Sequence, residues 1–163
     1  MLRIRPATAE DCDLIANLIR ELAVYEKLGD AAKATADDLR LHLFGERRFA
    51  EAILVEDGGE AVGFALFFHN YSTFRGKPGI YLEDLFVRPT HRGRGLGKAL
   101  LARLARLAVE RGCGRFEWAV LDWNEPAIGF YRAIGAQPMD DWTVFRLDGD
   151  AMASLAAKDV QSC

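Results

Sequence analysis

The sequence predicts a single mixed α/β domain that spans residues 1–163. Two apolar runs, residues 50–57 and 60–69, flank a turn of sequence DGG, which is typical of an antiparallel hairpin. A predicted strand, a glycine-rich loop, a predicted helix and a further strand then follow one another over residues 80–121, the order of a parallel β-α-β unit. The sheet is therefore expected to be antiparallel in one part and parallel in the other.

The N-terminal part is expected to hold one strand and two helices. Residues 2–6 (LRIRP) alternate apolar and charged side chains and end at a proline, which predicts a strand. A capping-box pattern that begins at Thr8 precedes apolar residues at helical spacing, so a helix is predicted from about 8 to 27. The same pattern beginning at Thr35 predicts a shorter second helix.

The β-α-β unit supplies the next three elements. Residues 80–87 (IYLEDLFV) predict a strand. Leucines at helical spacing predict a helix that runs from the glycine-rich loop to about residue 111. Residues 115–121 predict the strand that completes the unit.

The C-terminal part is expected to add one helix and the last of the sheet. A short helix is predicted to begin at Asn124, a favoured N-cap residue, and to end at Gly135. Residues 137–147 are expected to form the last strand or strand pair. The alanine-rich tail 149–163 is expected to be weakly helical at best, so the core of the domain is about residues 2–148.

Composition excludes several classes of protein. Half of the residues are apolar, 28% are charged and the formal net charge is −3, so a dedicated nucleic-acid-binding domain is not expected. No apolar run is long enough to span a membrane, and the N-terminus lacks the apolar stretch of a signal peptide. The cysteines, Cys12, Cys113 and Cys163, lack CxxC spacing, which disfavours a disulfide framework or zinc site and fits a cytoplasmic protein.

The stretch HRGRGLGKAL (91–100) has the composition of a phosphate-binding loop, but two familiar motifs fail on spacing. A P-loop needs a glycine where Arg92 stands and a serine or threonine where Ala99 stands. A dinucleotide fingerprint needs its third glycine where Lys98 or Leu100 stands. What remains is an R-x-x-G-x-G loop between a strand and a helix.

That arrangement has two interpretations. Unpaired N–H groups at the start of the helix favour an anion, and glycines at positions 95 and 97 let it approach the backbone closely. Arg88, Arg92, Arg94 and Lys98 would add positive charge. The alternative is a tight turn in which the glycines only serve a positive φ and the arginines are solvated.

The same residues carry a resemblance to a known family. The chain resembles the GNAT superfamily of N-acetyltransferases, and within it the diamine (spermidine/spermine) and thialysine acetyltransferases. The matching stretches are IRPATAEDC (4–12), ELAVYE (21–26), YLEDLFV (81–87), RGRGLG (92–97) and WNEPAIGFY (123–131). The resemblance implies a six- to seven-stranded sheet that is splayed between its fourth and fifth strands and flanked by about four helices, with acetyl-coenzyme A in the splay.

The resemblance also implies coenzyme contacts. Backbone groups of Leu85, Phe86 and Val87 would bind the pantetheine arm. The pyrophosphate would rest on backbone amides of the loop, near Lys98. The loop residues are Arg92, Gly93, Arg94, Gly95, Leu96 and Gly97. Asn124 would add a coenzyme contact, although its capping of the helix is a complete structural explanation for it.

Acetyl transfer to an ammonium substrate needs a base for the nitrogen and an acid for the departing thiolate. Tyr131 matches the family's acid, and a phenol of pKa about 10 keeps its proton at neutral pH. Glu83 matches the family's base, acting through a water, and Asp84 matches a residue that attracts the cation. Adjacent carboxylates inside an apolar strand are costly unless paired or useful. Regular strand geometry would separate them, but the family's fold implies a bulge there.

Each of these residues also has a possible structural role that involves no catalysis. Tyr131 could simply pack the last helix on the sheet, and Glu83 and Asp84 could form ion pairs with arginines. Trp142 corresponds to an aromatic that lines the family's amine site, although a core tryptophan is equally compatible with the sequence.

The loop before residue 80 departs from the family. Ser72 and Phe74 stand where the family has an aspartate and a tryptophan, so one substrate-binding charge is missing and the aromatic wall is smaller. Loss of one charge-assisted contact costs about 1.5–3 kcal/mol. A shorter, lysine-like amine is therefore expected to fit better than spermine.

The function predicted is acetyl-coenzyme A-dependent acetylation of a small primary amine by direct attack in a ternary complex. The alternatives are acetylation of protein lysines or of another metabolite, and a coenzyme-binding protein without catalysis. His42, His69 and His91 show no metal-ligand spacing, so no metal is expected. The resemblance implies a homodimer, and neither a membrane nor a nucleic acid is an expected partner.

Overall fold

The computed structural model describes residues 1–160, and the chain divides into two compact units, residues 1–121 and residues 122–163. Each unit is described by itself. The boundary falls between the predicted β-α-β unit and the predicted last helix. A single domain over residues 1–163 therefore stays a prediction, as does the N-acetyltransferase core at 2–148.

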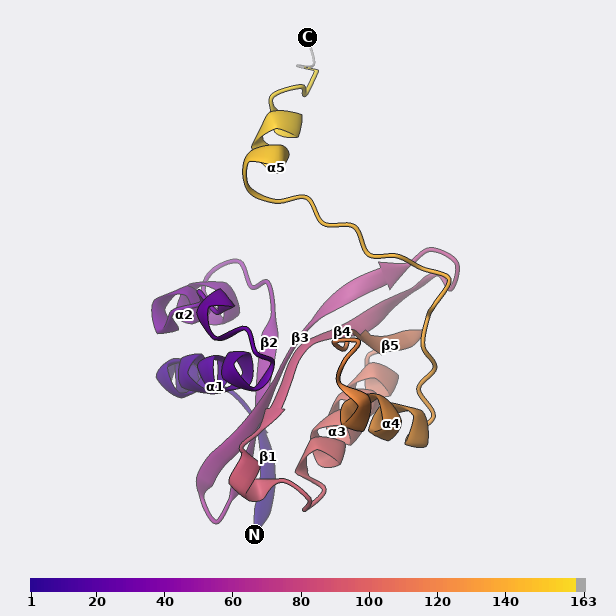
Figure 1. The fold of residues 1–163 in the computed structure, drawn as a ribbon. Helices are drawn as coiled ribbons and strands as arrows, with labels where there is room; N and C mark the ends of the chain where they lie inside the picture. The colour runs from indigo at the N-terminus through magenta and orange to yellow at the C-terminus, as the bar shows by residue number, and fades with distance from the viewer. Residues whose placement is uncertain (161–163) are drawn as a thin grey trace. The chain divides into compact units, whose positions relative to one another are not determined.

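The first unit is built on one five-stranded mixed sheet with the strand order β1-β2-β3-β4-β5 (Figure 1). The first three pairings are antiparallel and the β4–β5 pairing is parallel. This confirms the predicted fold class, although the sheet has five strands where six or seven were expected. The strands are β1 (Leu2–Pro6), β2 (Glu51–Asp57), β3 (Glu60–Ser72), β4 (Lys77–Val87) and β5 (Arg115–Trp118).

Three helices of this unit begin where the capping and glycine patterns predicted. They are α1 (Cys12–Tyr25), α2 (Ala36–Phe44) and α3 (Leu96–Glu110). A 3-10 turn, η1 (Ala9–Asp11), precedes α1 inside the capping box that begins at Thr8. The Thr35 hydroxyl accepts the backbone N–H of Asp38 at 3.1 Å, so the second capping box is also formed.

The core lies on both faces of the sheet. On one face, Leu54, Phe64 and Phe86 pack against buried residues of α1 and α2. Helix α3 covers the other face and buries Leu100 and Leu104 completely (Figure 1). Strand alternation accounts for this division, because neighbouring residues of a strand point to opposite faces.

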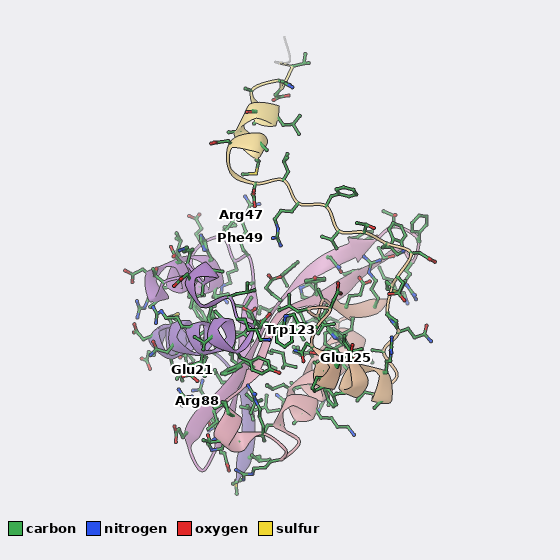
Figure 2. The ribbon with its side chains drawn as sticks, viewed as in Figure 1. Glu21, Arg47, Phe49, Arg88, Trp123 and Glu125 are labelled. Carbon is green, nitrogen blue, oxygen red and sulfur yellow. The ribbon has the colours of Figure 1, made fainter. Side chains whose placement is uncertain are left out.

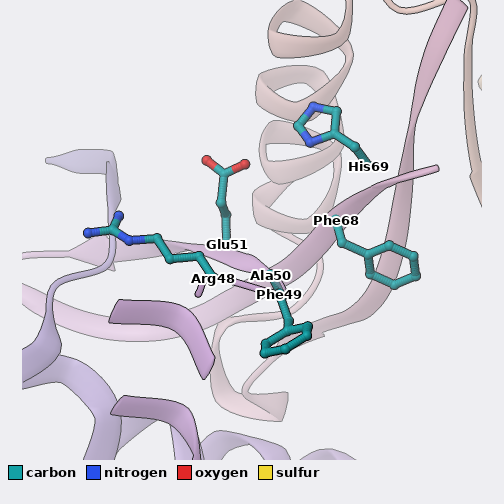
Figure 3. A pocket seen from close by; sticks show the side chains of 6 residues that line it. All are labelled: Arg48, Phe49, Ala50, Glu51, Phe68 and His69. Atoms are coloured by element: carbon teal, nitrogen blue, oxygen red, sulfur yellow. The ribbon is translucent and has the colours of Figure 1, made fainter. Parts of the chain in front are cut away.

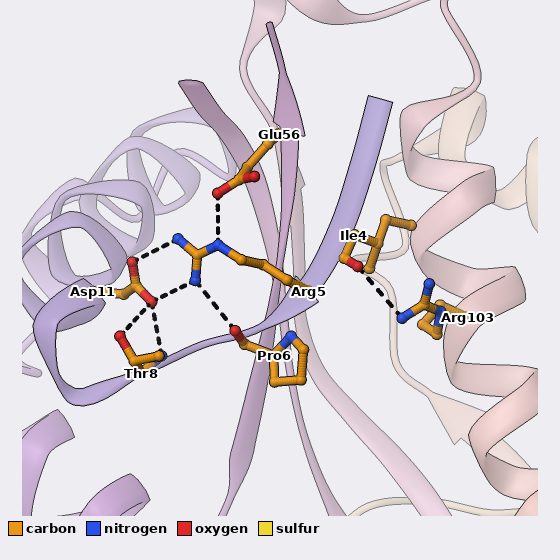
Figure 4. A network of polar contacts seen from close by, with 7 residues as sticks. All are labelled: Ile4, Arg5, Pro6, Thr8, Asp11, Glu56 and Arg103. Atoms are coloured by element: carbon orange, nitrogen blue, oxygen red, sulfur yellow. Dashed lines mark hydrogen bonds and ion pairs between the residues drawn. The ribbon is translucent and has the colours of Figure 1, made fainter. Parts of the chain in front are cut away.

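A polar network fixes the start of α1 to the sheet (Figure 4). The Arg5 guanidinium of β1 donates to Asp11 at 2.7 and 2.9 Å and to Glu56 of β2 at 2.6 Å. The side-chain hydrogen bond from Arg5 lowers the pKa of Asp11 to about 2. The Asp11 carboxylate also accepts the backbone N–H of Thr8 at 2.7 Å. One guanidinium therefore joins two strands and the beginning of the helix.

The second unit contains two helices, α4 (Glu125–Ala133) and α5 (Gly149–Ala156). The prediction of a strand or strand pair at residues 137–147 is wrong for the described structure, which has no strand there. A strand needs a neighbouring strand for its backbone groups, and the described residues from 122 on contain none. Because α5 is a formed helix, the tail after residue 148 contains more helix than expected. Cys163 lies outside the described residues.

Within residues 1–160, no helix has the length and apolar character needed to cross a membrane.

Candidate active site

A β-bulge in β4 sets the direction of the two predicted carboxylates. Leu66 of β3 is paired with Asp84, whereas the next residue, Phe67, is paired with Leu82. Glu83 is therefore the extra residue of β4, and the regular alternation of side chains is broken at that point. This is the bulge that the resemblance implied. Glu83 is exposed, and Asp84 lies on the face of the sheet that carries α1 and α2.

Asp84 lies in a negative environment. Burial, together with the negative charges of Glu83 and Glu26, raises the pKa of Asp84 to about 6. Burial also raises the pKa of Glu26, the residue directly after α1. The charges of two carboxyl groups, Glu83 and Glu26, thus act on Asp84, and this negative environment favours a cationic ligand.

Glu26 is a site residue that the sequence analysis missed. It lies in the stretch ELAVYE, which contributed to the family resemblance, but nothing in its local pattern separates it from a solvated residue at a helix end. Its proximity to Asp84 arises only from the packing of α1 on the sheet. No pattern within one element could have shown it.

The outer part of β4 has no strand on one side. The parallel pairing of β4 with β5 ends at Leu82 and Trp118. The Arg88 N–H donates to the Val62 carbonyl of β3 at 2.9 Å. Because backbone groups of successive residues alternate between the two edges of a strand, those of Phe86 face β3 and those of Leu85 and Val87 face the open edge. Two of the three residues predicted to bind pantetheine therefore present backbone groups there.

The glycine-rich loop has the geometry of an anion site. Gly93 and Gly95 have φ of 75° and 78°, and Gly95 is the N-cap residue of α3. The first N–H groups of α3 therefore lie next to a backbone that only glycine adopts readily. Lys98, in the first turn of α3, is exposed.

Gly97 needs a different explanation. It does not have a positive φ, and apart from its chain neighbours and the backbone of its own helix no atom lies within 4 Å of where its Cβ would be. Neither backbone strain nor protein packing requires glycine at this position. The absence of a Cβ at position 97 leaves space beside the N–H groups at the start of α3. A phosphate group can lie close to the backbone there. The residues of the loop thus fit the predicted coenzyme.

The arginines around the loop are not simply solvated. Arg94 forms an ion pair with Asp57 at 2.5 Å. Arg88 contacts Glu21 of α1 at 3.1 Å and Glu60 at 3.2 Å (Figure 2). These two side chains join the loop region to the β2–β3 turn and to α1. Both arginines are therefore paired with carboxylates, and Arg94 is also half-exposed.

Ser72 is the last residue of β3, and Phe74 lies in the turn that joins β3 to β4. Ser72 is buried, and its hydroxyl accepts the backbone N–H of Arg75 at 3.2 Å. Phe74 is 94% exposed at the end of this hairpin. Ser72 therefore stabilises the turn, and within the first unit Phe74 forms no buried aromatic wall.

An open cavity of about 400 Å³ lies beside Phe68 of β3 (Figure 3). Its other lining residues are Arg48, Phe49, Ala50, Glu51 and His69. The Phe68 ring also contacts the ring of Tyr81, two residues before Glu83, with centroids 5.2 Å apart. Burial and the charges of Glu83 and Glu117 raise the pKa of Tyr81. Aromatic surface therefore continues from this cavity towards the carboxylates.

The remaining predicted residues lie in the second unit. The Asn124 side chain accepts the backbone N–H of Ala127 at 3.3 Å, which confirms it as the N-cap of α4. Tyr131 lies in α4, partly buried, with its ring centroid 5.7 Å from that of Phe130. Trp142 is 70% exposed. The roles of Tyr131, Trp142 and Asn124 in binding or catalysis stay predictions.

No metal site is apparent in the described part of the chain. Residues 1–160 contain no group of three or more histidine, cysteine or acidic side chains placed to hold an ion. Cys12 is completely buried in the core, and burial raises the pKa of its thiol.

Comparisons with known proteins identify the family of the chain. The family model described as "Acetyltransferase (GNAT) family" matches residues 16–136. Thialysine N-epsilon-acetyltransferase from Bos taurus is 42% identical, over 95% of this chain and 97% of that protein. L-ornithine N5-acetyltransferase NATA1 from Arabidopsis thaliana is 34% identical, over 94% of this chain and 87% of that protein.

A solved structure shares the fold. An integron cassette protein from V. cholerae superposes with a TM-score of 0.81 at 28% identity, covering 95% of this chain and 97% of that one. The matched family model covers β2–β5, the glycine-rich loop and α4. The chain therefore belongs to the GNAT acetyltransferase family and is an acyltransferase.

Proposed function

We propose that this enzyme transfers the acetyl group of acetyl-coenzyme A to the terminal primary amine of a lysine- or ornithine-like small molecule. The observation that carries the proposal is the group of carboxylates formed by Glu83, Asp84 and Glu26. It offers negative charge to an ammonium group beside the open edge of β4. The similar proteins named for thialysine and ornithine acetylation support the same class of substrate.

The reaction proceeds by direct attack. Glu83, through a water, accepts a proton from the bound ammonium, and the free amine attacks the thioester carbonyl. The carbon–sulfur bond breaks, the attacking nitrogen loses its second proton to solvent, and Tyr131 donates its phenolic proton to the coenzyme thiolate. Solvent then reprotonates Tyr131, and the proton on Glu83 is released, so the net products are the amide, free coenzyme A and one proton.

The missing charge at Ser72 narrows the choice of amine. Because Ser72 is an uncharged residue buried at the end of β3, it offers no anionic contact for the distant end of a long polycation. A monoamine or amino acid needs fewer such contacts. Protein lysines are the second candidate, since the same chemistry applies to them. Trp142 and Phe74 are proposed as aromatic contacts for the amine, and Asn124 and Lys98 as coenzyme contacts.

We further propose that the enzyme works in the cytoplasm as a homodimer. The cysteine pattern supports the first point, because Cys12 and Cys113 are free thiols. The second rests on the family resemblance.

The choice of amine is tested with a panel of substrates. Lysine, thialysine and ornithine are expected to give a higher kcat/KM than spermidine and spermine, by about tenfold or more for one lost charge-assisted contact. Thiol release from acetyl-coenzyme A measures each rate. Ser72→Asp serves as the matched variant and is expected to narrow the difference. Equal or better turnover of spermine by the natural chain would contradict the proposal.

The catalytic roles are tested with two conservative substitutions. Tyr131→Phe and Glu83→Gln are each expected to lower kcat by about 10²–10⁴-fold, because each removes one proton-transfer group. Tyr71→Phe, at an exposed tyrosine of β3, is the control and is expected to keep full activity. Full activity of Tyr131→Phe would show that another group protonates the thiolate.

The glycine at position 97 is tested by adding one methyl group. Gly97→Ala is expected to leave the thermal stability of the free protein unchanged or slightly higher, since no protein atom opposes the new Cβ. The same variant is expected to bind acetyl-coenzyme A at least tenfold more weakly, as measured by calorimetry. Unchanged coenzyme affinity would place the pyrophosphate elsewhere.

A further inference from the structure

The side chain of Arg92, the first residue of the R-x-x-G-x-G loop, is held by three groups of the first unit. Its guanidinium carbon lies 4.3 Å from the centre of the Tyr25 ring and 5.5 Å from that of Phe86. Its Nε donates to the backbone carbonyl of Val87 at 2.9 Å. Tyr25 is the last residue of α1, and Phe86 and Val87 lie at the end of β4. Arg92 thus joins the loop to both elements.

These contacts restrict a segment that would otherwise be mobile. Gly93 follows Arg92 directly and Gly95 is three residues after it, and glycines lose more backbone freedom on ordering than any other residue. A loop that is ordered before its ligand arrives binds that ligand more tightly, since less entropy is lost on binding. The stack of a guanidinium on an aromatic ring contributes about 0.5–1 kcal/mol at an exposed site.

Tyr25 is the part of this arrangement that comes from outside the coenzyme-binding segments. It is 40% exposed, so packing of the core does not explain its position on Arg92. Phe86, in contrast, belongs to the hydrophobic core between the sheet and α1. Removing the Tyr25 ring would therefore remove one of the three contacts that hold Arg92 without opening a cavity in the core.

We propose that Tyr25 is a positioning residue for the coenzyme: its ring holds the Arg92 guanidinium and thereby keeps the glycine-rich loop in the shape that accepts the pyrophosphate. The proposal rests on the proposed function. Tyr25 acts through Arg92 and contributes to coenzyme affinity rather than to amine binding.

The residue after Tyr25, Glu26, makes the proposed role of Tyr25 easier to test. Glu26 follows Tyr25 directly, and its charge acts on Asp84, which we assign to the amine. Two adjacent residues at the end of α1 therefore serve different substrates. Substitutions at the two positions are expected to affect different kinetic constants, a separation that a general loss of structure would not produce.

The test compares Tyr25→Leu with Tyr25→Phe. Calorimetry without amine is expected to show coenzyme A binding about three- to fivefold weaker for Tyr25→Leu, the loss expected for an exposed cation–π contact. Tyr25→Phe keeps the ring and is expected to restore the natural affinity. In the double variant with Arg92→Gln, Tyr25→Leu is expected to add no further loss, since the two residues act as one unit.

Glu26→Gln is the matched variant one residue away. It is expected to raise the KM for the amine and to leave coenzyme affinity unchanged, whereas Tyr25→Leu changes coenzyme affinity and leaves the amine KM unchanged. Tyr71→Leu, at an exposed tyrosine of β3, controls for loss of an aromatic side chain. Thermal melting of each variant confirms folding.

The outcomes separate the two proposals. If the natural chain does not bind coenzyme A, the proposed function is wrong. If it does bind, and Tyr25→Leu binds equally well, the positioning role is wrong. Equal losses in Tyr25→Phe and Tyr25→Leu would also overturn it, because the hydroxyl rather than the ring would then be responsible.

Discussion

The site depends on the point at which the pairing of β4 with β5 ends. The parallel pairing with β5 stops at Leu82, and the bulge follows at once, at Glu83. The end of the pairing leaves backbone groups of β4 without a strand partner on the side of β5. The bulge changes the direction of the side chains that follow it. One short segment therefore supplies an open edge for an extended ligand and two carboxylates beside it. A regular five-stranded sheet of the same composition would offer neither.

Helix α1 complements this edge because it is fixed at both ends. Arg5 anchors its start through Asp11, and Arg88 contacts Glu21 in its third turn. Its last residues then carry Tyr25 to the glycine-rich loop and Glu26 to Asp84. The helix thus links the coenzyme loop with the carboxylates, although its sequence contains no recognisable catalytic motif.

Local patterns in the sequence predicted most of the elements. The DGG turn gave the correct hairpin, both capping boxes formed, and Asn124 caps α4. These features succeed because their partners lie within a few residues. The strand predicted at 137–147 is absent for the opposite reason, since strand formation depends on a partner that is distant in the sequence.

The site was predictable where a motif is continuous and hidden where it is assembled by packing. The loop glycines and the pair Glu83–Asp84 are adjacent in the sequence, so spacing and the family resemblance pointed to them. The contributions of Glu26 and of the ring under Arg92 need α1 to lie against β4. Such contacts between separate elements leave no periodic signal in either segment.

Residue-resolved amide hydrogen exchange tests the central claim that the open edge of β4 receives the coenzyme. Saturating coenzyme A is expected to slow exchange at the backbone N–H groups of Leu85 and Val87 and of the first turn of α3. The Phe86 N–H, which faces β3, is expected to change little. Unchanged exchange at Leu85 and Val87 in the saturated protein would contradict this account of the site.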